Sequence, residues 1–376
     1  DHAKGNVVGS TMKRQRVGVI GCGVISGIYF QNLTQFDAVE VVSCADLNPV
    51  ASQAVVEKYP SIKAVSTEEM LADSSIDIVL NLTQPQFHFD VMKAGIAAGK
   101  HVYGEKPLSV SFDDSVEMLR LADEAGVRVG CAPDTFLGAG IQTCRELIDQ
   151  GAIGQPIGAT AFFTTPGHER WHPAPEFYYK IGGGPMLDMG PYYMTALVNL
   201  MGPAKSVSGS ARITYPQRTI TSEPKNGTQI DVEIPTHVSG TVDFANGAVA
   251  TVMTSFDVWG ARLPFIEVYG SEGSLSVPNP NNFGDPVQIL TRDTEEWKDV
   301  PYSRPFSENS RGLGVADMAA SISANEPHRA NGVMASHVLE ILHAFGRSSD
   351  SGMRIDLTTT CERPSPLPVD ALTFGK

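Results

Sequence analysis

A carboxylate and a phenol stand four residues apart in the stretch GGGPMLDMGPYY, where three glycines precede Asp188 and Tyr192. Four residues of α-helix turn through about 400°, so these side chains would share one face. Pro191 must lie in the first turn or kink the helix, because it has no N–H to donate. The stretch predicts an acid and a phenol facing a cavity at the start of a buried helix over 186–201. A packed tyrosine and an N-capping aspartate have the same spacing and remain an alternative.

A lysine follows an apolar segment in the sequence GEKP, where Glu105 and Lys106 precede Pro107. If that segment is a strand of a parallel sheet, the lysine lies at the carboxyl edge, where open α/β sheets bind ligands. An exposed lysine in a surface turn fits the dipeptide equally well.

A glycine-rich turn lies between the first apolar strand, RQRVGVI, and a helical pattern. Gly21 would permit the tight turn, and Gly23 would let the backbone approach a pyrophosphate at the helix N-terminus. Ser26 takes the place of the third glycine, where only a small side chain is needed. Asp46 ends the second strand, where an acid accepts ribose hydroxyls and repels a 2′-phosphate, so the pattern predicts NAD rather than NADP. The predicted cofactor-binding residues are Gly21, Gly23, Val24, Ile25, Asp46, Thr83, Glu105 and Lys106. The alternative is a glycine turn in an ordinary α/β domain that binds no dinucleotide.

The segment HERWH, residues 168–172, matches the HExxH pattern of zinc proteases. That pattern works when a helix places both histidines on one face. Pro173 disfavours helical angles at His172, and no third ligand is apparent, so we expect no metal site. We expect instead a loop that carries Trp171 and His172 over a pocket for a polyhydroxylated ligand. A packed surface loop is the competing interpretation.

Alternation of strands and helices organises the first third of the chain. Strands are expected in 14–20, 39–47, 77–85, 100–107 and 127–132, and helices near 24–33, 49–59, 87–98 and 111–126. This order predicts a doubly wound parallel sheet.

The pattern of expected elements changes after about residue 136, where strands predominate. Strands are expected in 157–166, 206–215, 236–247, 248–259, 264–277 and 286–293, with helices near 186–201 and 333–345 and a polar excursion over 215–235. These elements predict an α+β domain with a large, mostly antiparallel open sheet. We therefore expect two domains, 12–135 and 136–376.

Composition limits the classes of function. The 376 residues are 42% hydrophobic and 19% charged, as in globular proteins, and no apolar run is long enough to span a membrane. A formal charge of −14 argues against a nucleic-acid partner. The five cysteines match no metal or redox spacing, and the first eleven residues lack the apolar core of a signal peptide. We expect a cytoplasmic protein that starts naturally at Met12.

Together these motifs resemble the glucose–fructose oxidoreductase, inositol dehydrogenase and rhizopine-catabolism family, usually written Gfo/Idh/MocA. The resemblance runs from Val17 to about Leu357, with GxGxxS, Asp46, GEKP and GGGPMLDMGPYY in the family's order and spacing. It implies an N-terminal Rossmann domain and a C-terminal domain whose open sheet mediates a homodimer or homotetramer.

The resemblance also implies catalytic roles. Lys106 matches the family's catalytic-site lysine and Asp188 the acid of its second motif. Tyr192 falls where many members carry a histidine, which departs from the inositol-dehydrogenase pattern and resembles the tyrosine branch. Tyr192 would take or return the proton of a substrate hydroxyl, Lys106 would polarise the carbonyl that forms, and Asp188 would orient the hydroxyls.

The resemblance leaves three functions open. The first is an NAD-dependent dehydrogenase of a sugar, polyol or glycoside. The second is an NAD-dependent glycosidase, in which transient oxidation of one carbon permits elimination of the glycosidic bond before the hydride returns. The third is a sugar-sensing regulator without turnover, against which the joint presence of Lys106, Asp188 and Tyr192 speaks.

Overall fold

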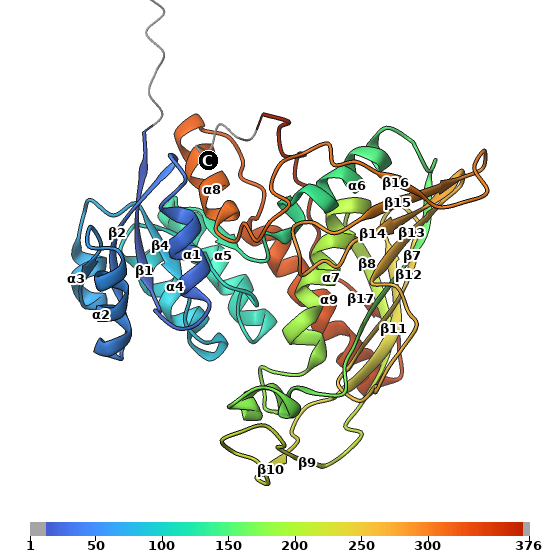
Figure 1. Ribbon diagram of the computed structural model, residues 1–376, viewed down its shortest axis with the longest axis horizontal. Helices are drawn as coiled ribbons and strands as arrows, with labels where there is room; N and C mark the ends of the chain where they lie inside the picture. Colours follow the sequence, from blue (N-terminus) through green and yellow to red (C-terminus); the bar gives the residue numbers. More distant parts are fainter. Residues whose placement is uncertain (1–12, 371–376) are drawn as a thin grey trace, which may run out of the picture.

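A computed structural model describes residues 13–370, and the predictions about the start of the chain lie outside them. The first part of the chain forms a six-stranded parallel sheet with helices on both faces (Figure 1). Its strands are β1 (Gln15–Ile20), β2 (Val39–Ala45), β3 (Lys63–Ala64), β4 (Ile78–Asn81), β5 (His101–Gly104) and β6 (Val129–Cys131). Its helices are α1 (Ser26–Leu33), α2 (Pro49–Lys58), α3 (Thr67–Ala72), α4 (His88–Ala97) and α5 (Phe112–Ala125).

The strand order of this sheet is β3-β2-β1-β4-β5-β6, so the direction of winding reverses between β1 and β4. This is the order of a dinucleotide-binding Rossmann sheet, whose ligand lies outside the carboxyl ends of the strands at that reversal. The predicted doubly wound parallel sheet is therefore confirmed. All four helices that the sequence predicted here are present, with ends displaced by a few residues, while α3 and β3 were not predicted.

The second part of the chain builds a nine-stranded, mostly antiparallel sheet, as predicted, in the order β16-β15-β14-β13-β7-β12-β11-β8-β17. The strands are β7 (Pro156–Thr164), β8 (Ala204–Arg212), β11 (His237–Phe244), β12 (Val249–Ser255), β13 (Ile266–Gly270), β14 (Gly273–Val277), β15 (Val287–Thr291), β16 (Lys298–Val300) and β17 (Ile355–Asp356). Among the described strands of this sheet, only β7 and β12 pair in parallel.

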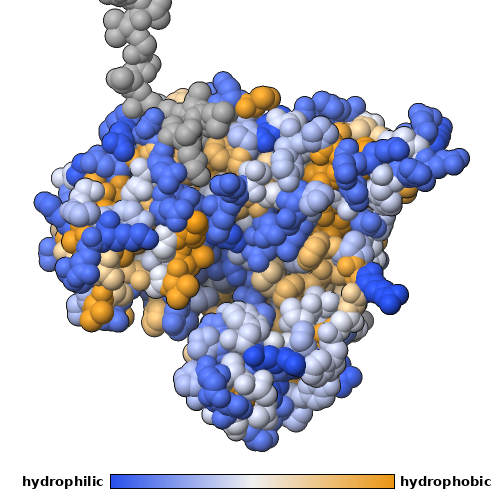
Figure 2. All heavy atoms as spheres, in the orientation of Figure 1, coloured by the Kyte–Doolittle hydropathy of each residue, from blue (hydrophilic) through white to orange (hydrophobic). Residues whose placement is uncertain are grey.

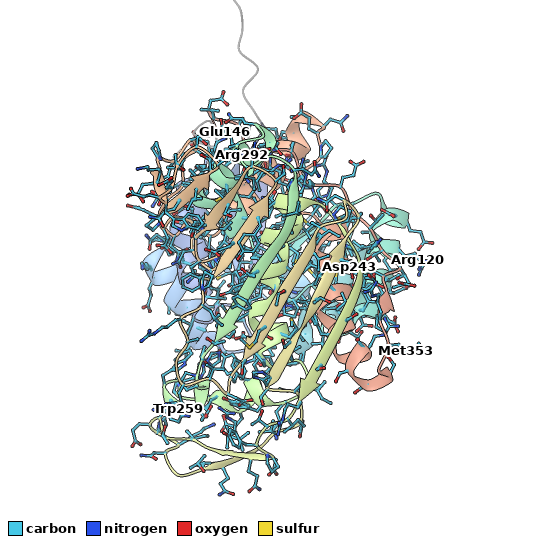
Figure 3. The ribbon with its side chains drawn as sticks, turned by 90° about the vertical axis from the view of Figure 1, so that its right-hand side faces the viewer. Arg120, Glu146, Asp243, Trp259, Arg292 and Met353 are labelled. Carbon is cyan, nitrogen blue, oxygen red and sulfur yellow. The ribbon has the colours of Figure 1, made fainter. Side chains whose placement is uncertain are left out.

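Three helices cover one face of the nine-stranded sheet and separate it from the first sheet (Figure 1). They are α6 (Ala139–Asp149), α7 (Pro185–Met201) and α9 (Gly332–Ser351). The other face carries no helix in the described part of the chain and is turned toward the viewer in Figure 3, with Asp243 and Arg292 on it or at its edge. One face of the sheet is thus core, and the opposite face is open.

Two elements differ from the sequence-based expectation. The segment expected as a polar excursion over 215–235 holds a small antiparallel pair, β9 (Gln217–Thr219) and β10 (Gln229–Asp231), in a lobe below the main body (Figure 1). Helix α8 (Leu313–Ala324) was not predicted, and it packs against α1, β1 and β6 of the first sheet. The chain therefore returns to its first domain late in the sequence. The boundary at residue 135 stays a prediction.

Helix α7 forms where the glycine-rich stretch predicted a buried helix. Gly184 precedes it with φ 87°, a left-handed angle that glycine adopts freely, and Pro185 takes a first-turn position. Pro191 lies inside the helix, and most side chains from Pro185 to Met201 are buried. The helix is therefore held by packing against the sheet rather than by intrinsic helix propensity.

Within residues 13–370, no helix is long and apolar enough to cross a membrane. The five cysteines are all buried and free.

Candidate active site

Lys106 and Asp188 meet at the carboxyl edge of the Rossmann sheet. Lys106 follows β5, and Asp188 lies in the first turn of α7. The Lys106 ammonium donates to the Asp188 backbone carbonyl oxygen at 2.5 Å and to Asp188 Oδ1 at 3.4 Å. Both side chains are only 16% exposed. This contact, which the sequence did not predict, joins a lysine of one motif to the acid of another across 82 residues of sequence.

Burial and charge act in opposite directions on this pair. Burial by itself would lower the pKa of Lys106, but the nearby Asp188, Tyr192 and Glu105 together outweigh burial and raise that pKa above its ordinary value. Burial would raise the pKa of Asp188, but the Lys106 ammonium and a hydrogen bond from His168 hold it below its ordinary value. Lys106 is therefore a cation and Asp188 an anion at neutral pH.

Tyr192 lies one helical turn beyond Asp188 on α7, as the spacing predicted. The Lys106 ammonium lies over its ring, 5.2 Å from the ring centroid. The Tyr192 hydroxyl accepts a hydrogen bond from Arg311 Nη2 at 3.4 Å. Tyr192 is half-buried, whereas the next residue, Tyr193, is 1% exposed. The phenol that the sequence singled out is thus the one that faces the lysine.

His168 joins this group, a contact that the sequence did not predict. Its Nε2 lies 3.2 Å from Asp188 Oδ2, so one carboxylate is shared between Lys106 and His168. The His168 ring packs edge-on against Tyr178, with ring centroids 4.4 Å apart. His168 belongs to a one-turn 3-10 helix, His168–Arg170, rather than to an α-helix. The HExxH geometry for zinc is therefore not formed at this segment.

Trp171 and His172 lie beside His168. The Trp171 ring is 5.1 Å from the His168 ring and 5.3 Å from the His172 ring, and its side chain is 61% exposed. Burial and the nearby His168 lower the pKa of His172, whose Nδ1 accepts the Ala174 N–H. The molecular surface is hollowed between the Rossmann domain and the lobe of β9 and β10 (Figure 2). A role of Trp171 and His172 in binding substrate stays a prediction.

The glycine turn after β1 fits a dinucleotide. Gly21 has φ 105°, and a Cβ there would lie 2.7 Å from the backbone of Leu82. A Cβ at Gly23 would meet nothing within 4 Å, so open space adjoins the backbone where a pyrophosphate would approach. Within residues 13–370, the N–H groups of Gly23, Val24 and Ile25 donate no hydrogen bond, and Val24 is fully exposed. These N–H groups at the start of α1 are available to donate hydrogen bonds to an anion.

The other predicted cofactor residues lie along the same edge. Asp46 accepts the Cys22 N–H at 2.7 Å and the Asn48 N–H at 2.8 Å, which fixes its carboxylate beside the glycine turn. Thr83 follows β4 and donates to Asn81 Oδ1 at 2.6 Å.

Glu105 accepts a hydrogen bond from Tyr29 of α1 at 2.5 Å, so it joins the lysine loop to the helix that follows the glycine turn. All the predicted cofactor residues therefore lie at the carboxyl ends of β1, β2, β4 and β5. Their contacts with a cofactor stay predictions.

Comparisons with known proteins agree with this geometry. The model of the "Oxidoreductase family, NAD-binding Rossmann fold" matches residues 15–132, and the "GFO/IDH/MocA C-terminal domain" model matches residues 141–276. The 1,5-anhydro-D-fructose reductase of Ensifer adhaerens is 31% identical over 320 residues, which cover 83% of this chain and 89% of the relative. Myo-inositol 2-dehydrogenase of Thermotoga maritima is 25% identical over 346 residues, 91% of this chain and 98% of the relative.

Solved structures show the same fold. Levoglucosan dehydrogenase in complex with NADH superposes with a TM-score of 0.80 at 19% identity, covering 92% of this chain and all of that one. An NAD-binding oxidoreductase from Klebsiella pneumoniae gives the same TM-score at 22% identity and the same coverage.

The fold, the glycine turn and the matching models define an oxidoreductase with an NAD-binding Rossmann domain. Within that class, the chain belongs to the Gfo/Idh/MocA family, as its motifs predicted. It is a dehydrogenase-like enzyme whose cofactor is NAD.

Proposed function

We propose that the chain oxidises a secondary alcohol of a sugar, polyol or glycoside to a ketone, or catalyses the reverse reduction. The observation that carries the proposal is the convergence of Lys106, Asp188 and Tyr192 just beyond the carboxyl end of β5. A cation, an anion and a phenol at this edge are the groups that alcohol oxidation needs next to a nicotinamide.

Each side chain has a distinct task in this proposal. Bound NAD supplies the acceptor or donor of the hydride. Tyr192 takes the proton of the substrate hydroxyl, or returns it in the reverse direction. Lys106, held as a cation by Asp188, stabilises the partial negative charge on the substrate oxygen. The second carboxylate oxygen of Asp188 contacts His168, so both oxygens of the acid are held in place, and Asp188 orients the substrate hydroxyls.

The substrate class rests on two kinds of support. The relatives named above act, by their names, on 1,5-anhydro-D-fructose, on myo-inositol and on levoglucosan, which are small polyhydroxylated compounds. The exposed face of Trp171 offers an apolar platform, and the polar edge of His172 lies beside it. Such a pair suits a ligand with apolar C–H faces and a rim of hydroxyls.

A substrate panel tests the proposal. Purified protein is incubated with NAD and myo-inositol, levoglucosan or D-xylose, and with NADH and 1,5-anhydro-D-fructose, while absorbance at the NADH band and the products are followed. At least one compound is expected to change the NADH absorbance in step with the appearance of a ketone or alcohol product. Absence of turnover across sugars, inositols and glycosides, with NADH still bound, would contradict the proposal and favour a sensor.

The same panel separates the glycosidase alternative. Aryl glycosides are included because a glycosidase that recycles its NAD releases free sugar without net NADH formation. Free sugar that depends on NAD but leaves NADH absorbance unchanged would replace the dehydrogenase by the glycosidase.

A further inference from the structure

Arg311 reaches the catalytic phenol from a distant part of the chain. It precedes α8, 119 residues after Tyr192, and its Nη2 lies 3.4 Å from the Tyr192 hydroxyl. The same nitrogen donates to Asn281 Oδ1 at 2.7 Å and to the Asn281 carbonyl oxygen at 3.1 Å. The guanidinium carbon lies 5.9 Å from the centroid of the Tyr192 ring. The guanidinium is therefore held by Asn281 against both the ring and the oxygen of the phenol.

Two cations thus flank Tyr192, but they contact different parts of it. The Lys106 ammonium bonds to Asp188 and lies over the ring face. Within residues 13–370, the hydrogen bond to the Tyr192 oxygen comes from Arg311. Arg311, rather than Lys106, therefore lies next to the phenol oxygen.

The backbone of Arg311 is fixed as firmly as its side chain. Asn32, a residue of α1 that is 2% exposed, donates from Nδ2 to the carbonyl oxygens of Arg311 at 2.7 Å and Asn309 at 3.0 Å. The next residue, Gly312, donates its N–H to the buried carboxylate of Asp134 at 3.0 Å. These contacts join the Arg311 loop to the helix that begins at the glycine turn. The guanidinium is thus preorganised, since its anchors do not depend on substrate.

We propose that Arg311 is a positioning residue for the proton transfer: it orients the Tyr192 hydroxyl and stabilises the phenolate. This proposal rests on the proposed function. In the reducing direction the Tyr192 O–H bond breaks, its proton goes to the substrate oxygen, and the electron pair stays on the phenol oxygen. In the oxidising direction the phenolate takes the proton of the substrate hydroxyl. In both directions an anion exists at the atom that Arg311 faces, and a charge-assisted hydrogen bond strengthens as that charge develops.

The experiment compares Arg311→Met and Arg311→Lys with a surface control, Arg292→Met, whose side chain is 72% exposed at the far edge of the large sheet. The assay uses the panel compound with the highest turnover, and NADH binding is measured by fluorescence. Arg311→Met is expected to lower kcat about 10- to 100-fold, the effect of one hydrogen bond to a charged group. KM and NADH affinity should change less than about 3-fold, because the contact matters only during proton transfer. Arg311→Lys should recover part of the loss, and Arg292→Met should match the wild type.

A double-mutant cycle isolates the contact. In a Tyr192→Phe background the phenol oxygen is gone, so Arg311→Met should lower the residual rate less than about 2-fold. An equal loss in both backgrounds, or an unchanged kcat in the single variant, would overturn the role of Arg311. Wild-type turnover by Tyr192→Phe would overturn the catalytic role of Tyr192 and the role of Arg311 with it. Absence of turnover by the wild type across the panel would instead overturn the proposed function, so the two failures are distinguishable. If Arg311→Met does not bind NADH, Asn281→Ala, which removes the side-chain anchor of the guanidinium and keeps Arg311 itself, undergoes the same cycle with the same expected direction of coupling.

Discussion

The Lys106 ammonium is bonded to two oxygens of one residue, the backbone carbonyl and Oδ1 of Asp188. This pair joins the loop after β5 to the first turn of α7, and so joins the Rossmann domain to the helix that carries the phenol. Removing either partner would leave the other as a half-buried, uncompensated charge, which is costly. The pair therefore sets both the geometry and the charge of the reaction site.

Asp46 should make the enzyme prefer NAD. Its carboxylate is fixed beside the glycine turn by the N–H of Cys22, where a 2′-phosphate on the adenosine ribose would be repelled. We expect NAD(H) to bind at least ten-fold better than NADP(H), about 1.4 kcal/mol. Asp46→Asn keeps an acceptor oxygen but removes the negative charge, so it should reduce the preference for NAD(H) over NADP(H). Calorimetry that shows equal or tighter NADP(H) binding to the wild type would reject this assignment.

Asp134 should make stability depend on pH. The side chain is 1% exposed, and burial raises its pKa from 3.8 to about 6. The folded state therefore favours the protonated form of Asp134 more than the unfolded state does. The resulting stabilisation of the fold is fully present below about pH 4 and is lost as the pH rises through about 6. Asp134→Asn removes the titration and keeps an acceptor for the Gly312 and Gly314 N–H groups.

The measurement is urea unfolding of both proteins between about pH 4 and pH 7. The stability of the wild type relative to the variant should fall by about 1–3 kcal/mol across that range. A difference that does not change with pH would show that Asp134 titrates normally.

The HERWH segment should not carry a catalytic metal. His168 Nε2 faces Asp188, and His172 Nδ1 accepts a backbone N–H, so the two rings serve other partners. Purified protein is expected to contain no stoichiometric zinc, and a chelator should leave turnover unchanged. Activity that a chelator abolishes and zinc restores would disprove this.

Much of the fold could be predicted because it depends on local signals. The strands and helices around Gly21 and Asp46 follow apolar runs, caps and glycine turns that lie within a few residues of each other. Helix α8 gave no such signal, because its residues are buried nearly all round and show little periodicity. The β9–β10 pair is short and rich in polar residues, so it resembles a loop in sequence.

Residues of the site could be predicted from the sequence only where they belong to a recognisable motif. Lys106, Asp188 and Tyr192 lie in stretches whose order and spacing indicate a role, and the structure brings them together. His168 and Arg311 reach the same place through tertiary contacts over 20 and 119 residues, which no local pattern encodes. The HERWH segment matched a zinc pattern that we set aside because of Pro173, and no other signal in it pointed to His168; the structure shows a single 3-10 turn there.

We expect the open face of the large sheet to mediate the formation of a homo-oligomer. Phe162 and Met253 are paired across β7 and β12 on that face, and Val249 and Phe265 are exposed by 45% and 49%. We expect a dimer or tetramer by light scattering, and Phe265→Glu should weaken it because a charge would be buried in the interface. Val333→Glu, an exposed apolar position on α9, is the matched control. A monomeric wild type at micromolar concentration would contradict this expectation.

The most direct test of the account is the turnover of Tyr192→Phe on the best panel compound. The change removes one oxygen and keeps the ring that packs beneath the Lys106 ammonium. If Tyr192 transfers the proton, kcat should fall about 10²- to 10⁴-fold while NADH binding and the melting temperature stay near wild type, and Lys106→Ala should lose activity on the same scale. If Tyr192 is only a packed residue, the change costs about 1 kcal/mol of stability and leaves kcat unchanged. A Tyr192→Phe enzyme with wild-type turnover would contradict the catalytic assignment.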